Sequence, residues 1–219
     1  RLLAKGLLSA GVFREGGEAN ARIQAAFERR YSQGGGTLIF RTANVVFTKT
    51  AEGEPINPTL PEQLMQAKAL VLFMSGDAAK PMRAALALNG ASNTPLFAAS
   101  DITDTSDTKT NGQLDGIEFL QMPWLNSGGN ALMLNASQLQ KLPSARGPGA
   151  RLNAFGIDAW MIATRLPVWL NSPNTVMNGA TGLLHMEPDG TVQRTLPWWV
   201  FRAGIAQAAM DSGALAVRQ

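Results

Sequence analysis

Two short polar segments contain the residue types that could bind a ligand. Ser75-Gly76-Asp77 directly follows the apolar residues 69–74, and Ser100-Asp101 follows the apolar residues 95–99. Hydroxyls, carboxylates and free backbone amides at the ends of adjacent strands can hold a small polar ligand such as an amino acid. The same residue types also suit helix caps and turns, so both interpretations stay open. The candidate ligand residues are Ser75, Asp77, Ser100 and Asp101.

The elements that would position these residues form a βαβ unit. Residues 69–74 are apolar without alternation, which is typical of a strand buried on both faces of a parallel sheet. A helix is expected over residues 78–89, with Asp77 as its N-cap and Gly90 at its end. Pro81 fits this helix because we expect it in the first turn, where its missing N–H is not needed. Open α/β sheets usually have their clefts at the carboxyl ends of such strands.

The flanking segments extend the α/β pattern. The sequence predicts a strand over residues 7–13, a helix over residues 18–31 and a strand over residues 37–40. Thr59-Leu60-Pro61-Glu62 has the pattern of a capping box and predicts a short helix before the central strand. A further strand is expected over residues 116–122. This order predicts an α/β fold with a right-handed, mostly parallel sheet that helices cover on both faces.

The C-terminal part follows a different pattern. A helix is expected over residues 151–166 and should end at Pro167, and a β-hairpin is expected over residues 182–196. A helix and a hairpin cannot bury a core alone, so they must pack on the first lobe or on strands encoded upstream. We expect upstream strands, because residues 1–5 have the pattern of mid-helix sequence without a cap. The helix face expected to be buried comprises Leu152, Phe155, Ala159, Ile162, Ala163 and Leu166.

The composition excludes several classes of protein. The 219 residues suffice for one good core or two smaller lobes. Nineteen Lys and Arg against 16 Asp and Glu give a net charge of +3, without the clustered basic face of nucleic-acid binders. No apolar run reaches the ~18–20 residues that a membrane-spanning helix needs. The chain contains no cysteine, which excludes disulfides, thiolate catalysis and zinc–sulfur sites.

Few titratable side chains converge in a pattern known from enzymes. His185 is the only histidine, and it lies far in sequence from Ser75 and Ser100, so a Ser-His-Asp triad is not expected. Gly34-Gly35-Gly36 follows a predicted helix and precedes a strand, which is the reverse of a nucleotide-binding loop. We therefore expect no enzyme activity, no catalytic residue, no metal site and no cofactor.

Three stretches together resemble one protein family. They are residues 114–125, 151–160 and 179–198, and the last stretch runs on to Phe201-Arg202-Ala203-Gly204. The last stretch contains T-G, a strand, a turn and then R-x-L-x-W before F-R-x-G. This pattern is similar to a signature of the bacterial outer-membrane lipoproteins that activate penicillin-binding proteins, the LpoA or LppC family.

The resemblance implies a type I periplasmic-binding-protein-like fold (Venus flytrap), in which a hinge joins two α/β lobes. Residues 8–125 would then be lobe two with a nearly complete parallel sheet, and residues 126–150 a hinge region with a short helix. Residues 151–204 would be the returning part of lobe one, and residues 205–219 a C-terminal tail. The opening of lobe one, the helical-repeat domain and the lipidated cysteine of full-length members are expected to lie outside this chain.

The resemblance also implies a function without bond chemistry. Such a module would regulate peptidoglycan synthesis in the periplasm by binding a class A penicillin-binding protein, the bifunctional peptidoglycan synthase. Full-length members are anchored in the outer membrane, so the membrane would be reached only through a lipid anchor that this chain lacks, and no nucleic-acid partner is expected. The alternative is a periplasmic solute-binding protein for amino acids or other small polar ligands, because that class uses the same fold.

Overall fold

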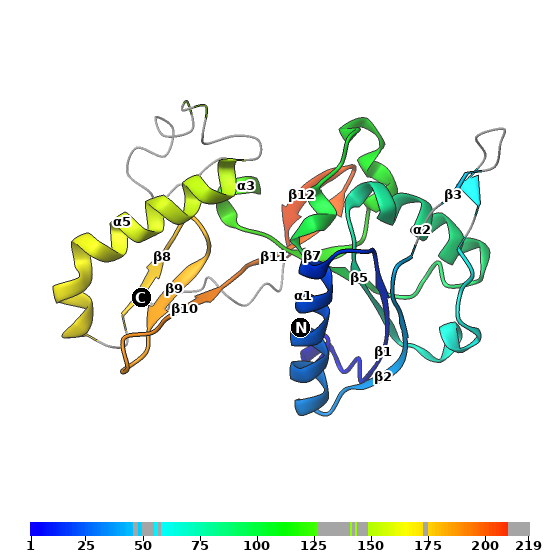
Figure 1. Cartoon of the computed structure of the whole chain (residues 1–219), viewed down its shortest axis with the longest axis horizontal. Helices are drawn as coiled ribbons and strands as arrows, with labels where there is room; N and C mark the ends of the chain where they lie inside the picture. The colour runs from blue at the N-terminus through cyan, green and yellow to red at the C-terminus, as the bar shows by residue number, and fades with distance from the viewer. Residues whose placement is uncertain are drawn as a thin grey trace. The chain divides into compact units, whose positions relative to one another are not determined.

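The chain divides into two compact units (Figure 1). Unit 1 comprises residues 1–119 and 200–206, and unit 2 comprises residues 120–199 and 207–219. Most of the hinge region expected at residues 126–150 lies outside the described residues. The computed structural model describes residues 1–45, 48–49, 55–56, 58–126, 141, 143, 149–172 and 175–209.

The largest sheet is mostly parallel, as the sequence predicted. Its strand order among the described residues is β12-β11-β7-β6-β5-β1-β2. The pairs β1–β2, β1–β5, β5–β6 and β6–β7 are all parallel. The strands are β1 (Ser9–Arg14), β2 (Thr37–Thr42), β5 (Ala69–Phe73), β6 (Leu96–Ala98), β7 (Glu118–Leu120), β11 (Trp198–Arg202) and β12 (Ile205–Ala208). A separate two-stranded ladder pairs β3 (Thr48–Lys49) with β4 (Pro55–Ile56).

The strand order puts the two main helices on opposite faces of this sheet. From β1 the chain passes through α1 (Glu18–Gln33) to the outer strand β2. From β5 it passes through α2 (Gly76–Leu88) in the other direction to β6. Because such crossovers are right-handed, the two helices cover opposite faces. The direction reverses between β1 and β5, and open α/β sheets bind ligands at the carboxyl ends of the strands at such a switch point.

The core of unit 1 forms around β5, whose five residues are all buried. Phe27 of α1 packs on Phe73 of β5 with 5.7 Å between ring centroids. Phe13 of β1 packs edge-on against Phe40 of β2, with 5.1 Å between their centroids. The buried apolar residues of α2 are Ala78, Ala79, Met82, Ala85 and Leu86.

The start of α2 differs from the prediction. The N-cap is Ser75, whose Oγ accepts a hydrogen bond from the N–H of Ala78, and Asp77 lies inside the first turn. The predicted Asp77 cap is therefore wrong, because both residues suit a cap and the helix begins at the earlier one. Pro81 consequently lies in the second turn, where its ring nitrogen cannot donate to the carbonyl of residue 77.

Two short segments of unit 1 also differ from the sequence predictions. The capping box at Thr59 does not form, because the 3₁₀ helix η2 (Glu62–Gln66) begins after Pro61, which makes no side-chain cap. The first residues form only the 3₁₀ turn η1 (Leu3–Lys5) and not a longer helix. Gly6 ends this turn with a φ of 70°, a conformation that favours glycine.

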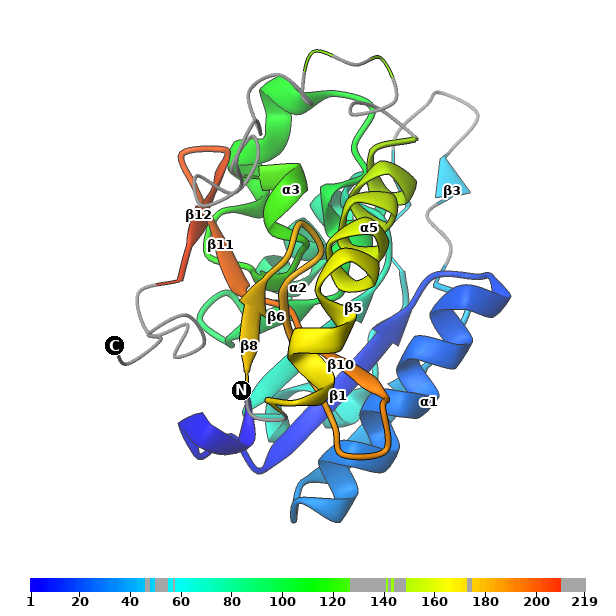
Figure 2. The same cartoon turned by 90° about the vertical axis from the view of Figure 1, so that its left-hand side faces the viewer.

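Unit 2 contains a long helix that packs on a small antiparallel sheet (Figure 2). The predicted hairpin is confirmed as β9 and β10, and its turn includes Gly190 with a φ of 86°. Trp169, Leu184 and Met186 form a buried cluster between helix and sheet. The described elements are α3 (Pro123–Asn126), α5 (Ala150–Leu170), β8 (Val176–Asn178), β9 (Leu183–Met186) and β10 (Val192–Thr195).

The end and the buried face of α5 were both predicted incorrectly. The helix continues through Pro167, because Trp169 beyond it is buried and its indole N–H donates to the carbonyl of Thr175 at 2.7 Å. The expected face is largely exposed: Leu152, Phe155 and Leu166 all face solvent. α5 is apolar on most sides, so its periodicity does not identify which face packs. The buried residues are Ala150, Ala154, Asp158 and Trp169.

Candidate functional site

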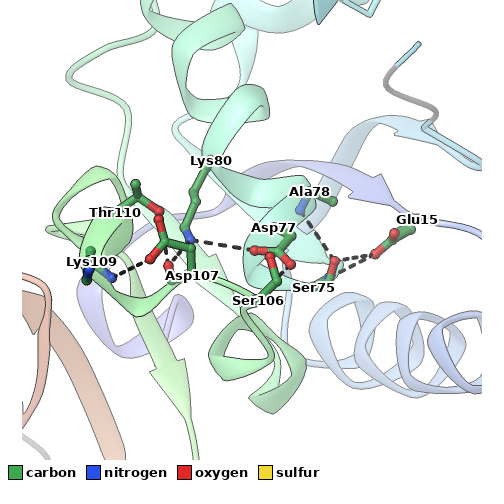
Figure 3. A network of polar contacts seen from close by, with 9 residues as sticks. All are labelled: Glu15, Ser75, Asp77, Ala78, Lys80, Ser106, Asp107, Lys109 and Thr110. Atoms are coloured by element: carbon green, nitrogen blue, oxygen red, sulfur yellow. Dashed lines mark hydrogen bonds and ion pairs between the residues drawn. The ribbon is translucent and has the colours of Figure 1, made fainter. Parts of the chain in front are cut away.

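The carboxyl ends of β1 and β5 meet at the switch point of the sheet. Glu15 directly follows β1, and its N–H donates to the carbonyl of Phe73 at 3.0 Å. Its carboxylate oxygen Oε2 accepts hydrogen bonds from the N–H of Ser75 at 2.9 Å and from Ser75 Oγ at 3.0 Å (Figure 3). Glu15 therefore joins the ends of the two strands through Ser75, one of the four candidate ligand residues.

Asp77 and Lys80 attach the first turns of α2 to the segment after β6. Asp77 Oδ2 accepts a hydrogen bond from the N–H of Ser106 at 2.8 Å. The Lys80 ammonium is nearly buried, donates to the carbonyl of Asp107 at 2.8 Å and lies 3.6 Å from Asp77 Oδ1 (Figure 3). Hydrogen bonds from Ser106 lower the pKa of Asp77 from its ordinary value, and the charge of Lys80 adds to this effect.

Asp107 continues this network as the N-cap of the 3₁₀ helix η4 (Thr108–Leu114). Its Oδ1 accepts a hydrogen bond from the N–H of Lys109 at 2.9 Å, and its carbonyl accepts one from Thr110 Oγ1 at 3.0 Å. Ser106 and Asp107 are thus held by side chains of α2, and Asp107 also bonds to the first residues of η4.

Ser100 and Asp101 open the 3₁₀ helix η3 (Ser100–Thr103) directly after β6. Ser100 Oγ lies 3.4 Å from Asp101 Oδ1, and the carbonyl of Ser100 accepts a hydrogen bond from Thr103 Oγ1 at 2.9 Å. Neither residue belongs to the network drawn in Figure 3, whereas Ser75 and Asp77 do. All four candidates make contacts typical of caps and turns, and their role as a ligand site stays a prediction.

Sequence reasoning missed Glu15, which makes the shortest side-chain contacts to Ser75. The predicted strand ended two residues before it, and no local pattern marks it as functional. Its partner lies 60 positions away, so the contact follows only once β1 and β5 are known to be neighbours. Knowledge of the strand order would have identified Glu15, because residues that follow adjacent parallel strands meet at one edge.

Two further carboxylates connect segments that belong to the resemblance. Asp115 accepts hydrogen bonds from the N–H groups of Ala203 and Gly204, both within unit 1. Within unit 2, the buried Asp158 of α5 accepts hydrogen bonds from the N–H of Ala180 at 2.6 Å and of Thr181 at 2.9 Å. Its Oδ2 also accepts a hydrogen bond from Thr181 Oγ1 at 2.5 Å. The last of the three stretches is therefore linked to each of the other two, through Asp115 within unit 1 and through Asp158 within unit 2.

The described residues contain no group of three or more His, Cys, Asp and Glu side chains arranged to hold a metal ion. None of the described helices combines the length and the hydrophobicity that a bilayer crossing requires.

A family model with the description "LppC putative lipoprotein" matches residues 43–204. The penicillin-binding protein activator LpoA of Pectobacterium parmentieri is 34% identical over 92 residues, which are 42% of this chain and 13% of that protein. The protein of the same name from Enterobacter sp. is 27% identical over 224 aligned residues, covering 84% of this chain and 30% of that protein. The chain thus spans less than a third of these relatives.

Solved structures with the same fold include activators and transport proteins. The LpoA C-domain from Haemophilus influenzae, described as a regulator of PBP1A, matches with a TM-score of 0.64 and 21% identity, over 95% of this chain and 63% of that domain. A putative branched-chain amino acid ABC transporter protein from Rhodospirillum rubrum matches with a TM-score of 0.67 and 15% identity, over 95% of this chain and 62% of that chain. These likenesses confirm the periplasmic-binding-protein-like α/β fold. The match of the family model over most of the sequence shows that this chain belongs to the LppC lipoprotein family.

Proposed function

We propose that this chain is part of a non-enzymatic regulator that binds a class A penicillin-binding protein and activates peptidoglycan synthesis. The observation that carries the proposal is the family match over residues 43–204, whose named relatives are penicillin-binding protein activators. The regulator would act in the periplasm and be held at the outer membrane through the lipid of the full-length lipoprotein.

The proposed activation needs no bond chemistry in this chain. A partner that binds the active conformation of the synthase more tightly than the inactive one shifts the synthase toward activity. The shift cannot exceed the difference between the two binding free energies, and the synthase must in turn hold the activator more tightly in its active state. This requires a stable surface and not a reactive group.

The lobe assignment is part of the proposal. We assign residues 8–125 to the second lobe of the family fold and residues 151–204 to the returning part of the first. The parallel strand order of unit 1 and the likeness to the LpoA C-domain support this assignment.

Binding and activity of the synthase test the proposal directly. The full-length lipoprotein that contains this chain should bind its cognate class A synthase in interferometry and raise its rate of glycan polymerisation. A second sample is the same lipoprotein with Asp158→Ala, which destabilises unit 2. It should bind the synthase less tightly than the unchanged lipoprotein. Absence of binding between two folded proteins would contradict the proposal.

A solute-binding function is the second candidate, because the Rhodospirillum rubrum transport protein has the same fold. In this reading Ser75, Asp77, Ser100 and Asp101 would contact an amino acid or another small polar ligand. A thermal-shift screen against amino acids and muropeptides tests it. The ligand-induced rise in melting temperature should vanish in Ser75→Ala and persist in the control Thr59→Ala, which changes an exposed residue outside the network. A screen without any rise contradicts this function.

A further inference from the structure

Glu15 is fixed at the switch point by its backbone as well as by its side chain. Its N–H donates to the carbonyl of Phe73, and its own carbonyl accepts a hydrogen bond from Arg14 Nη1 at 3.4 Å. The same Nη1 also lies 3.4 Å from the carbonyl oxygen of Gly17, to which it donates, and this closes the turn after β1. The half-buried Glu15 side chain is thereby directed at Ser75 (Figure 3).

The Glu15 carboxylate uses the hydrogen-bond donors that Ser75 could offer a ligand. A serine has one backbone N–H and one hydroxyl proton. Both are given to Glu15 Oε2, at 2.9 and 3.0 Å, while Ser75 Oγ accepts the N–H of Ala78. A free carboxylate that approached Ser75 would find both donors in use. It would also meet the negative charges of Glu15 and Asp77 nearby, and like charges repel.

We infer that Glu15 acts as a built-in substitute for a carboxylate ligand at the switch point. It satisfies Ser75, completes this edge of unit 1 without a solute and excludes small carboxylates, including amino acids, from Ser75. The inference therefore opposes the solute-binding candidate, which needs Ser75 as a ligand contact. The regulator proposed above would therefore not be switched by a small carboxylate at this position. Only that last step rests on the proposed function.

Chemical rescue of a Glu15 variant tests the inference. In the 219-residue chain, Glu15→Ala should lower the melting temperature, and sodium acetate should recover at least half of the loss relative to sodium chloride at equal ionic strength. Acetate should leave the melting temperature of the unchanged chain at its chloride value. The double variant Glu15→Ala/Ser75→Ala should lose the recovery, because it lacks the Ser75 hydroxyl that would donate a hydrogen bond to acetate.

Two outcomes would overturn the inference. If acetate raises the melting temperature of the unchanged chain as much as that of the Glu15→Ala variant, the donors of Ser75 are available despite Glu15. A Glu15→Ala chain that acetate does not recover would mean that Glu15 does not substitute for a ligand. If Glu15→Ala does not fold, calorimetric titration of the unchanged chain with glycine and leucine decides: saturable binding that Ser75→Ala abolishes contradicts the inference, and its absence supports it. Neither measurement involves the synthase, so this inference and the proposed function can fail separately.

Discussion

Asp115 Oδ1 accepts a hydrogen bond from the N–H of Gly204 at 2.9 Å, across 89 positions of the sequence. Its other oxygen accepts one from the N–H of Ala203, also at 2.9 Å. Both turn residues have positive φ, 50° for Ala203 and 72° for Gly204, as in the tight turns that join antiparallel strands. A non-glycine residue in this region is unfavourable, so the Asp115 carboxylate stabilises a strained turn between β11 and β12.

Loss of the Asp115 carboxylate should therefore destabilise unit 1. We expect Asp115→Ala to lower the free energy of unfolding by about 1.5–3 kcal/mol, the range for hydrogen bonds to charged groups. Asp115→Asn should cost less, because its carbonyl oxygen still accepts one bond. Urea denaturation measures both, with Glu62→Ala as the control at an exposed carboxylate. Ala203→Gly should recover part of the loss by relieving the positive φ, and equal stability of Asp115→Ala and the unchanged chain would contradict the account.

The buried Asp158 should have the corresponding role in unit 2. Asp158→Ala would leave the N–H groups of Ala180 and Thr181 and the Thr181 hydroxyl without an acceptor in a buried site. Unsatisfied buried donors cost about 1–3 kcal/mol each, so we expect a loss of at least ~3 kcal/mol. Tryptophan fluorescence during urea unfolding measures the loss, and Asp189→Ala in the exposed hairpin turn is the control. A change no larger than that of the control would argue against the role.

Stability should fall in acid partly through Asp77. Its pKa in the folded chain is lowered by the Ser106 hydrogen bonds and by Lys80, relative to the unfolded chain. A lowered carboxyl pKa contributes stability that is present above the unfolded pKa, about 4, and lost as the pH falls through the folded value. Thermal melts between about pH 6 and pH 2.5 should show a smaller acid loss in Asp77→Asn than in the unchanged chain. Parallel melting curves for the two proteins would exclude this contribution.

Sequence patterns predicted the elements whose signal is local. The uninterrupted apolar run at β5 required a strand buried on both faces, and the Pro-Asp-Gly turn required the hairpin of β9 and β10. Pattern alone could not choose between Ser75 and Asp77 as the cap of α2, because both side chains can accept the first free N–H groups. Because α5 has apolar residues on most of its sides, the sequence pattern likewise did not identify the face that packs.

The contacts that sequence reasoning missed are non-local. Glu15 and Ser75 lie 60 positions apart, and Asp115 and Gly204 lie 89 apart. Each pair comes together because two strands are adjacent in the sheet, and a single sequence does not specify which strands are adjacent. The candidate residues Ser75 and Asp77 were recognised because they end a clear strand, whereas Glu15 follows a strand that small residues make weak.

Several large apolar side chains of α5 are exposed, which bears on the relative stability of the two units. Leu152 and Trp160 are 77% and 72% exposed, and Leu170 is 60% exposed. Burying a side chain of this size is worth ~1.5–3 kcal/mol, and unit 2 gains little of that from these side chains. By contrast, helices cover β1 and β5 of unit 1 on both sides.

We therefore expect unit 2 to unfold locally at lower free energy than unit 1 when the 219-residue chain is expressed alone. Hydrogen exchange should show weaker protection for residues 151–170 and 183–195 than for residues 69–73 and 96–98. The exposed apolar side chains of α5 should also favour self-association, because large exposed apolar patches are uncommon on monomers. Leu170→Lys should reduce that association in light scattering, whereas Leu88→Lys, at a residue of unit 1 that is 75% exposed, should not. Equal protection of both units in a monomeric chain would show the prediction to be wrong.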